Sequence, residues 1–345
     1  MHSLTSYHIT NLKKSVVFHV LTRIGNINGL KSIRPHSVFL ILMAALFLSS
    51  CHHREIECPA GVAGRIDVRF MWDHAPEAEP DGMTLYFFPL DDGGQIWRFD
   101  IAGRDGGPVA LPLGRYRLLA YNNDLSRVSF TNKDSFYDFM ANAGIVSEGT
   151  VTPPGLLYAG TVEMINITMC GVEYVKPDGS VKNCNQGLVR CYPRRLSTVY
   201  TIEVRNVTGL EYLRTASVRL DGLAPSLRMV SDEPLGEAVG ENTALTPDVA
   251  NSTLGGVLTG FGSAPGTLGH QLTVTVTRGD GKSFAKSFDV TSQVLNSSDS
   301  KNVLIVVDGL KIPDDVTPPS PGEDVGIEVG VDGWNEIIID LTTGV

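Results

Sequence analysis

Arg-Ile-Asp-Val-Arg-Phe-Met-Trp, residues 65–72, places an apolar side chain at every second position. Positions 66, 68, 70 and 72 are apolar, and positions 65, 67 and 69 are charged. Successive side chains of a strand point to opposite faces of a sheet. This period of two therefore predicts a half-buried strand at residues 65–72.

Strand signals of the same kind dominate the rest of the chain. Residues 83–88 are apolar at nearly every position, which predicts a strand buried on both faces. Residues 303–307 form a continuous apolar run, which predicts a central strand. Turn sequences such as Asp92-Gly93-Gly94 separate these runs. Further strands are expected at residues 96–101, 116–121, 157–169, 200–204, 216–220, 272–276, 283–290 and 334–341.

Short strands between turns, almost without a period of 3.6, indicate an all-β fold of sandwich type. Two series of strands predict two tandem β-sandwich domains, residues 64–193 and 194–345. Residues 236–269 are rich in Gly, Thr and Ser and are expected to hold long loops. Residues 134–141 are expected to form a short helix or a loop, and residues 311–329 a loop.

The amino-terminal region has the composition of an export signal. Lys31 and Arg34 precede an apolar run, residues 38–48, that is too short for the ~20 residues of a spanning helix. The tetrad Leu48-Ser49-Ser50-Cys51 resembles the bacterial lipobox. We therefore expect residues 1–50 to be removed, Cys51 to carry diacylglyceryl and palmitate chains, and residues 51–63 to form a tether. The alternative is an ordinary secretory signal with an incidental cysteine, and the true start codon stays open.

Charge excludes one class of partner. The chain has a formal net charge of −10, and the first 50 residues hold 5 of its 28 basic residues and none of its 38 acidic ones. The exported part is therefore more acidic than the whole chain. Binding to nucleic acid needs clustered Lys and Arg against phosphate, so a nucleic-acid partner is not expected.

Four cysteines remain after Cys51, and their pairing stays open. Cys58, Cys170, Cys184 and Cys191 would lie in an oxidising compartment, where bridges can form. Four cysteines allow three pairings, among which Cys184 and Cys191 could close a small loop. The chain has no Cys-x-x-Cys pair, so no metal site is expected.

Catalytic signatures are missing from the sequence. Only His74 and His270 lie beyond the tether, and both are expected to be ordinary surface or loop residues. Neither accompanies a Gly-x-Ser-x-Gly elbow, and no phosphate-binding loop is present. The glycine-rich stretch 260–266 has the wrong spacing for a dinucleotide and is expected to be a flexible loop. We expect no enzyme activity and no cofactor, with a carboxylate-dependent glycosidase as a remote alternative.

Three blocks carry a resemblance to a known family: residues 80–89, 98–107 and 114–124. They read Pro-Asp-Gly-Met-Thr-Leu-Tyr-Phe-Phe-Pro, then Arg-Phe-Asp-Ile-Ala-Gly-Arg-Asp-Gly-Gly, then Gly-Arg-Tyr-Arg-Leu-Leu-Ala-Tyr-Asn-Asn-Asp. In this order they resemble the DUF5119 family of Bacteroidales lipoproteins, which looks fimbrillin-like. The resemblance covers about residues 64–341.

The resemblance implies two transthyretin-like β-sandwiches and a fimbrial or adhesive role as subunit, anchor or tip. Its implied partners are other fimbrial subunits, host or bacterial surface ligands and, through lipid on Cys51, the outer membrane, with the cell surface or a fimbrium as the location. In similar fimbrillins a cut after a basic residue removes the first strand. Arg65 and Arg194-Arg195 are the candidates for such a cut or for simple nicking.

A second hypothesis belongs to another class of function. The chain could hold polysaccharide at the cell surface for an uptake system. Exposed aromatic side chains would then stack on sugar rings, and Trp97, Tyr121 and Tyr158 are the candidate glycan contacts. This hypothesis requires that these three side chains be exposed.

Overall fold

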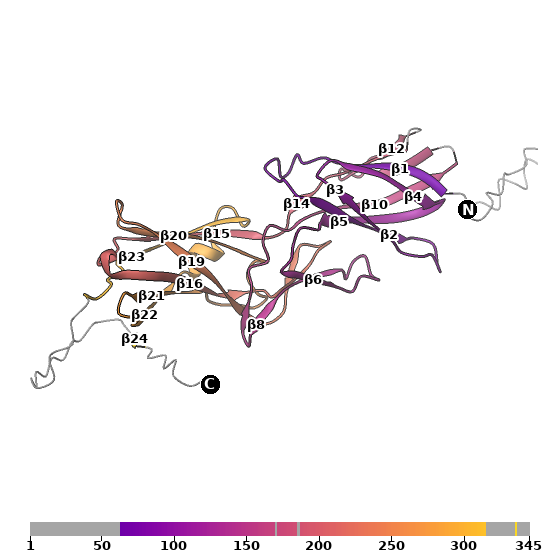
Figure 1. Cartoon of the computed structure of the whole chain (residues 1–345). Coiled ribbons are helices and arrows are strands. Elements are labelled where there is room, and N and C mark those ends of the chain that lie inside the picture. Colours follow the sequence, from indigo (N-terminus) through magenta and orange to yellow (C-terminus); the bar gives the residue numbers. More distant parts are fainter. Residues whose placement is uncertain (1–62, 170, 185–186, 315–334, 337–345) are drawn as a thin grey trace, which may run out of the picture. The chain divides into compact units, whose positions relative to one another are not determined.

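The structure is a computed structural model that describes residues 63–314, apart from 170 and 185–186, and the backbone of residues 335–336 (Figure 1). Strands dominate it, and the helical elements described are the 3-10 turn η1 (Leu210–Tyr212) and the short α3 (Thr291–Leu295). No described helix is long and apolar enough to cross a membrane. The expected all-β class is confirmed.

Two sheets enclose the first core. Their order is β13-β1-β4 in one and β12-β11-β10-β5-β2-β3 in the other, with β14 beside β10. The alternation at residues 65–72 forms β1, whose Ile66, Val68 and Phe70 are buried. The bounds are β1 (Ala63–Phe70), β2 (Gly82–Pro89), β3 (Trp97–Ala102), β4 (Gly106–Pro112), β5 (Gly114–Asn122), β10 (Tyr158–Thr168), β11 (Gly171–Val175), β12 (Val181–Cys184), β13 (Leu188–Cys191) and β14 (Arg194–Arg195).

Strand β2 is buried on both faces, as its sequence predicts. Leu85 and Phe87 belong to the first core, whereas Tyr86 and Phe88 join a separate cluster with Phe139. A small sheet ordered β18-β17-β7-β6 contributes to this second cluster. Its strands are β6 (Val128–Thr131), β7 (Met140–Ala143), β17 (Ser226–Arg228) and β18 (Glu233–Leu235).

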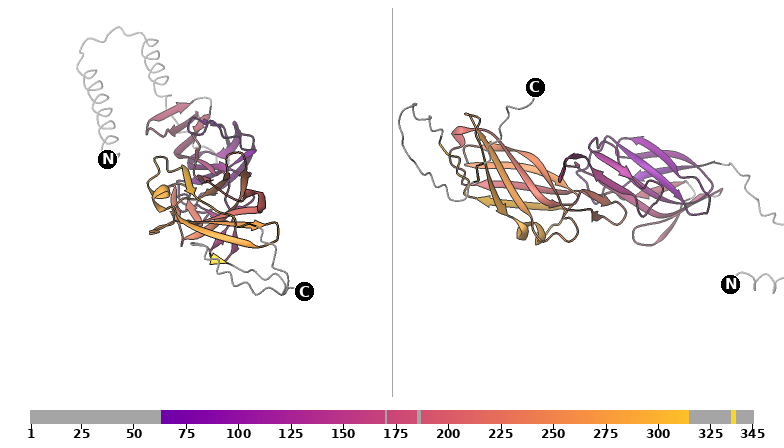
Figure 2. Two further views of the ribbon diagram at one scale, coloured as in Figure 1. Left: turned by 90° about the vertical axis from the view of Figure 1, so that its left-hand side faces the viewer. Right: turned by 90° about the horizontal axis from the view of Figure 1, so that it is seen from below.

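A long sheet builds the carboxy-terminal half, in the order β23-β15-β20-β19-β16-β21-β22-β24, with β9 beside β19 and β8 beside β9. Its strands run side by side in Figure 2, orange to yellow. Alternate residues of β15, β16, β20, β21 and β23 meet in one buried core. The bounds are β8 (Ile145–Ser147), β9 (Thr150–Val151), β15 (Thr198–Arg205), β16 (Leu213–Leu223), β19 (Val239–Asp248), β20 (Thr253–Gly260), β21 (Gln271–Arg278), β22 (Ser283–Asp289), β23 (Asn302–Asp308) and β24 (Asn335–Glu336).

The expectation of long loops at residues 236–269 is wrong, because β19 and β20 occupy most of that stretch. Its glycines allow close approach within the sheet. A Cβ on Gly256 would lie 2.7 Å from Leu245 Cδ2, and one on Gly240 would lie 2.2 Å from Arg219 Nη2. Threonine is in turn favoured in strands. The glycines and threonines of residues 236–269 are therefore compatible with closely packed strands.

Strand β23 lies at an edge of the described sheet, which corrects the expected central position of residues 303–307. Val303, Ile305 and Val307 enter the core, whereas Leu304 is 55% exposed. A continuous apolar run therefore does not require burial on both faces. Residues 134–141 form no helix but turns that lead into β7. Most of residues 311–329 and 334–341 lie outside the described residues, and the division at residues 193 and 194 stays a prediction.

Candidate functional site: the polar junction at Arg194–Ser197

The segment Arg194–Ser197 lies between β13, which belongs to the first core, and β15, which belongs to the core of the carboxy-terminal sheet. The Leu196 N–H donates to the Leu157 carbonyl at 2.8 Å, and the Ser197 Oγ accepts from the Leu157 N–H at 3.0 Å. Ser197 is fully buried. A buried backbone N–H without an acceptor is costly, so the Ser197 hydroxyl fixes the position of this segment against Leu157.

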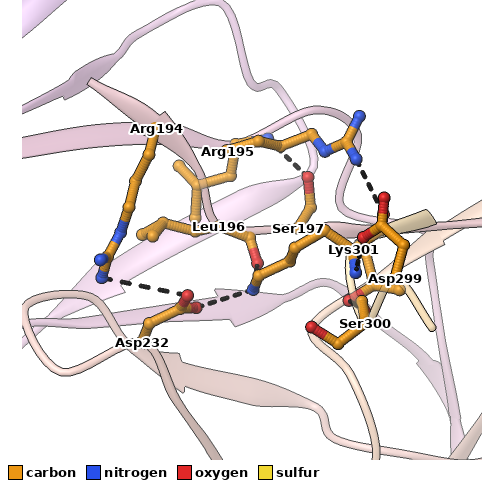
Figure 3. Close-up of polar contacts among 10 residues, drawn as sticks. Arg194, Arg195, Leu196, Ser197, Asp232, Asp299, Ser300 and Lys301 are labelled. Atoms are coloured by element: carbon orange, nitrogen blue, oxygen red, sulfur yellow. Dashed lines mark hydrogen bonds and ion pairs between the residues drawn. The ribbon is translucent and has the colours of Figure 1, made fainter. Parts of the chain in front are cut away.

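Two long cations, Arg195 and Lys301, hold the segment from the other side and extend in opposite directions (Figure 3). Arg195 Nη2 donates to the Lys301 carbonyl at 2.8 Å. Lys301 Nζ donates in turn to the Leu196 carbonyl and, at 2.9 Å, to Asp232 Oδ1. Arg194 lies 3.9 Å from the second oxygen of Asp232. Each cation thus satisfies a backbone carbonyl of the segment opposite.

Asp299 shapes the turn that presents Lys301. One oxygen of Asp299 accepts the backbone N–H of Lys301 at 2.8 Å and that of Asn302 at 3.1 Å. The hydrogen bond from the Asn302 side chain, followed by the one from the Lys301 backbone, lowers the pKa of Asp299 below its usual range. The carboxylate is therefore charged at neutral pH.

The junction borders a polar pocket. Arg194, Arg195, Asp232, Asp299, Lys301 and Asn302 bond to one another or to backbone around this pocket. The arrangement is therefore suited to holding two segments together. The lining residues are His74, Glu77, Arg194, Arg195, Asp232, Asp299, Lys301 and Asn302.

Both candidate cutting points lie in paired strands. Arg65 belongs to β1 and is the register partner of Ala110 in β4. Arg195 belongs to β14 and is the partner of Tyr158 in β10. A protease binds several residues of its substrate in extended form, so cutting at either point requires local unfolding first. The structure thus gives no support for processing of the folded chain at these arginines.

The predicted lipid attachment and most cysteine pairings lie outside the described residues. This holds for Cys51, Cys58, Cys170 and the side chain of Cys184. Cys191 is a buried free thiol, so the loop that a Cys184–Cys191 bridge would close is not formed. Burial raises the pKa of Cys191 to about 12, which makes it unreactive.

Two of the three candidate glycan contacts are buried, and the third is partly exposed. Tyr121 and Tyr158 are each 4% exposed, and Trp97 is half-buried against the first core. The Tyr121 ring lies 4.2 Å from that of Phe130, measured between centroids. A sugar ring needs an open aromatic face, so Tyr121 and Tyr158 are unsuited to this role in the folded chain, and of the three only Trp97 keeps part of its surface open.

His270 lies in the loop before β21, as expected, but its side chain is buried and not at the surface. It is 1% exposed, its Nε2 lies 3.0 Å from Ser263 Oγ, and its Nδ1 lies 3.0 Å from the Asp221 carbonyl. Burial lowers its pKa. Stretch 260–266 is a loop but is held in place, since Phe261 is buried and Ala264 N–H donates to the Gly222 carbonyl at 3.0 Å. His74 is exposed, as expected.

This Ser–His contact is structural, because it is sealed from solvent and a carbonyl takes the place of an orienting carboxylate. Among the residues that the structure describes, no three His, Cys, Asp or Glu side chains gather in a way that could hold a metal ion. The sequence did not indicate Asp232 or Lys301, because their roles depend on partners 69 to 105 positions away.

Comparison with known proteins identifies relatives of this chain. The family described as "Domain of unknown function (DUF5119)" matches residues 50–239. The "Putative fimbrium anchoring subunit Fim4B" of Bacteroides ovatus is 27% identical over 195 residues, which are 54% of each chain. This chain thus spans about half the length of that curated relative.

Solved structures share the fold. A crystal structure of a "putative adhesin" from Bacteroides ovatus superposes with a TM-score of 0.54 at 18% identity, over 78% of this chain and 99% of that one. The fimbrial anchor protein Mfa2 of Porphyromonas gingivalis reaches 0.43 at 13% identity, over 71% and 91%, which is too low to carry an argument. The family match covers more than half of the chain, including all three sequence blocks, and so the chain belongs to the DUF5119 family.

Proposed function

We propose that this chain is a lipid-anchored outer-membrane subunit that attaches a fimbrium to the cell and has no catalytic activity. The observation that carries this proposal is the match to the fimbrium anchoring subunit of Bacteroides ovatus. Other fimbrial subunits would be its partners. Lipid on Cys51 would hold it in the membrane, since each buried methylene contributes ~0.8 kcal/mol and two or more chains anchor stably.

An anchoring role is favoured over a role as a shaft subunit. Strand β1 lies at the centre of its sheet, between β13 and β4. Arg65 is inside this strand, so a cut there would leave most of the strand in place. A shaft subunit that opens an acceptor groove by losing its first strand would need a cutting point outside it. An uncut subunit is suited to the end of a polymer.

The proposal is tested by replacing the predicted lipid-bearing residue in the native host. With Cys51→Ala we expect the fimbrial polymer to be found in the medium, and with the wild-type chain on the cells. Ser50→Ala is the matched control, because it keeps a small residue before an intact cysteine. Immunoblots of cells and medium, heated mildly or boiled, report both location and polymer length.

The two parts of the proposal fail separately in this test. Fimbriae that stay on the cells in the Cys51→Ala strain would contradict anchoring through this lipid. Deleting the chain then tests anchoring itself, and fimbriae of unchanged length and location would refute it. A ladder of this chain's own bands that collapses on boiling would instead identify a shaft subunit.

A further inference from the structure

Strand β23 forms an edge of the described part of its sheet, and its register defines which backbone groups face outward. It runs parallel to β15, with Val199 opposite Asn302 and Arg205 opposite Asp308. Val199 N–H donates to the Lys301 carbonyl and Gly309 N–H to the Arg205 carbonyl, each at 3.0 Å. In a parallel ladder alternate residues bond to one neighbour. Residues 303, 305 and 307 therefore bond to β15, and residues 302, 304, 306 and 308 face away from it.

One side chain occupies the outer edge at Val306 as a strand would. Gln293 Oε1 accepts the Val306 N–H at 2.7 Å, and Gln293 Nε2 donates to the Val306 carbonyl at 3.0 Å. A primary amide offers one acceptor and one donor side by side, as a residue of a neighbouring strand does. A glutamate could not donate here, and a hydrocarbon side chain could do neither.

The position of Gln293 is built into the fold. Gln293 lies on α3. Val290 before it and Val294 after it are buried in the core of the carboxy-terminal sheet. Val290 N–H donates to the His270 carbonyl at 3.0 Å, which fixes the start of the helix. The packing of α3 therefore holds the Gln293 amide in position against β23.

The remainder of the edge is short. Asn302 N–H donates to Asp299 Oδ1 at 3.1 Å, so this end is capped as well. Between the two caps lies Leu304, whose backbone groups have no hydrogen-bond partner among the described residues and whose side chain is 55% exposed. An apolar edge strand with free backbone groups readily pairs with another chain. With both neighbours occupied, Leu304 is isolated, and the next outward-facing residue, Asp308, lies beyond the capped Val306.

We propose that Gln293 acts as a one-residue substitute strand that keeps β23 from pairing with a second copy of this chain. Without its amide, residues 304 and 306 would be open together. Two copies could then pair antiparallel about Leu304 and join their sheets. This inference does not depend on the proposed anchoring function, since it concerns which edge of the sandwich is closed to association.

The test uses the full-length chain in detergent, with light scattering and size-exclusion chromatography over a hundredfold range of concentration. Wild type is expected to be monomeric, and Gln293→Ala to form dimers as concentration rises, because antiparallel pairing of the same strand in two copies closes at the dimer. Leu304→Pro is the matched second change. It removes an outward N–H that β15 does not use, and proline is tolerated on edges of this kind.

Gln293→Ala combined with Leu304→Pro should therefore return to monomer, and Leu304→Pro alone should stay monomeric. A Gln293→Ala chain that stays monomeric at every concentration would overturn the proposal. So would a double variant that still associates, because pairing would then not run through this edge.

A measurement on wild type keeps the proposal testable if the variant does not fold. Val306 and Leu304 amides both point away from β15, but only Val306 has an acceptor. Residue-resolved hydrogen exchange should be at least tenfold slower at Val306 than at Leu304. Equal exchange at the two amides would refute the role of Gln293 without any substitution.

Discussion

Replacing Glu241 should change how stability depends on pH. Glu241 lies on β19 of the carboxy-terminal sheet, opposite Leu220 of β16 and Val151 of β9. Its side chain is fully buried, with 0% exposure. Neither carboxyl oxygen has a hydrogen-bond partner among the described residues. Burial raises the pKa of Glu241 from 4.5 to about 9, so the folded chain holds it protonated at neutral pH.

The sign follows from the direction of that shift. Between pH 4.5 and 9 the unfolded chain releases this proton and the folded chain keeps it, so folding becomes less favourable as pH rises. Each pH unit in this window costs about 1.4 kcal/mol. The contribution of the protonated Glu241 carboxyl to the free energy of unfolding is fully present below pH 4.5 and is lost by about pH 9.

The assay is urea denaturation of wild type and Glu241→Gln at several values between pH 5 and pH 8. The glutamine cannot titrate, so the difference in unfolding free energy between the two proteins isolates this carboxyl. It should shift by about 4 kcal/mol over that range in favour of the variant. Exposed Glu237→Gln is the control and should give curves parallel to wild type. Parallel curves for Glu241→Gln would refute the argument that burial holds the proton.

Four further substitutions test the packing and the junction. Gly256→Ala should cost about 1–3 kcal/mol, because its Cβ would meet Leu245 at 2.7 Å. Gly255→Ala, with nothing within 4 Å, should stay within about 0.5 kcal/mol in the same urea titration. Asn122→Ala should cost about 2–3 kcal/mol, since its Oδ1 accepts the buried Tyr158 N–H at 2.7 Å, and an unchanged midpoint would contradict this. Lys301→Met should speed tryptic cutting after Arg194 or Arg195 about tenfold, as the hold on Leu196 is lost, whereas equal rates would show that the junction opens by another route.

The strands were predictable from sequence because period two reports burial directly. Residues 65–72 and 272–276 alternate as expected, and Met83 to Phe88 are buried on both faces. The sequence also indicated the turn at Asp92-Gly93-Gly94 between β2 and β3, where Gly94 N–H donates to the Asp91 carbonyl at 3.3 Å. These features depend on neighbours along the chain and carry a local signal.

The predictions that the structure corrects share a cause. They were based on composition, which does not report which residues become neighbours in space. Glycines that suggested loops lie in β19 and β20, where side chains of adjacent strands approach them. Residues 303–307 suggested a central strand, but position within a sheet depends on which strand pairs alongside. The burial of His270 within its loop was not predicted, because its partners Ser263 and Asp221 can be identified only in the folded chain.

Strand edges decide how a β protein of this kind can associate, and the described edges differ in how they are closed. Strand β1 is paired on both sides, so its sheet offers no gap at that position. At β23 two side chains, Gln293 and Asp299, take the place of a neighbouring strand. Ordering one capping side chain costs less conformational entropy than ordering a whole strand, and a single substitution can remove such a cap. A subunit meant to end a polymer benefits from such closed edges, because unpaired edges recruit copies of the same chain. If Gln293→Ala dimerises, a single amide separates a chain whose β23 edge is closed from one whose edge pairs with a second copy.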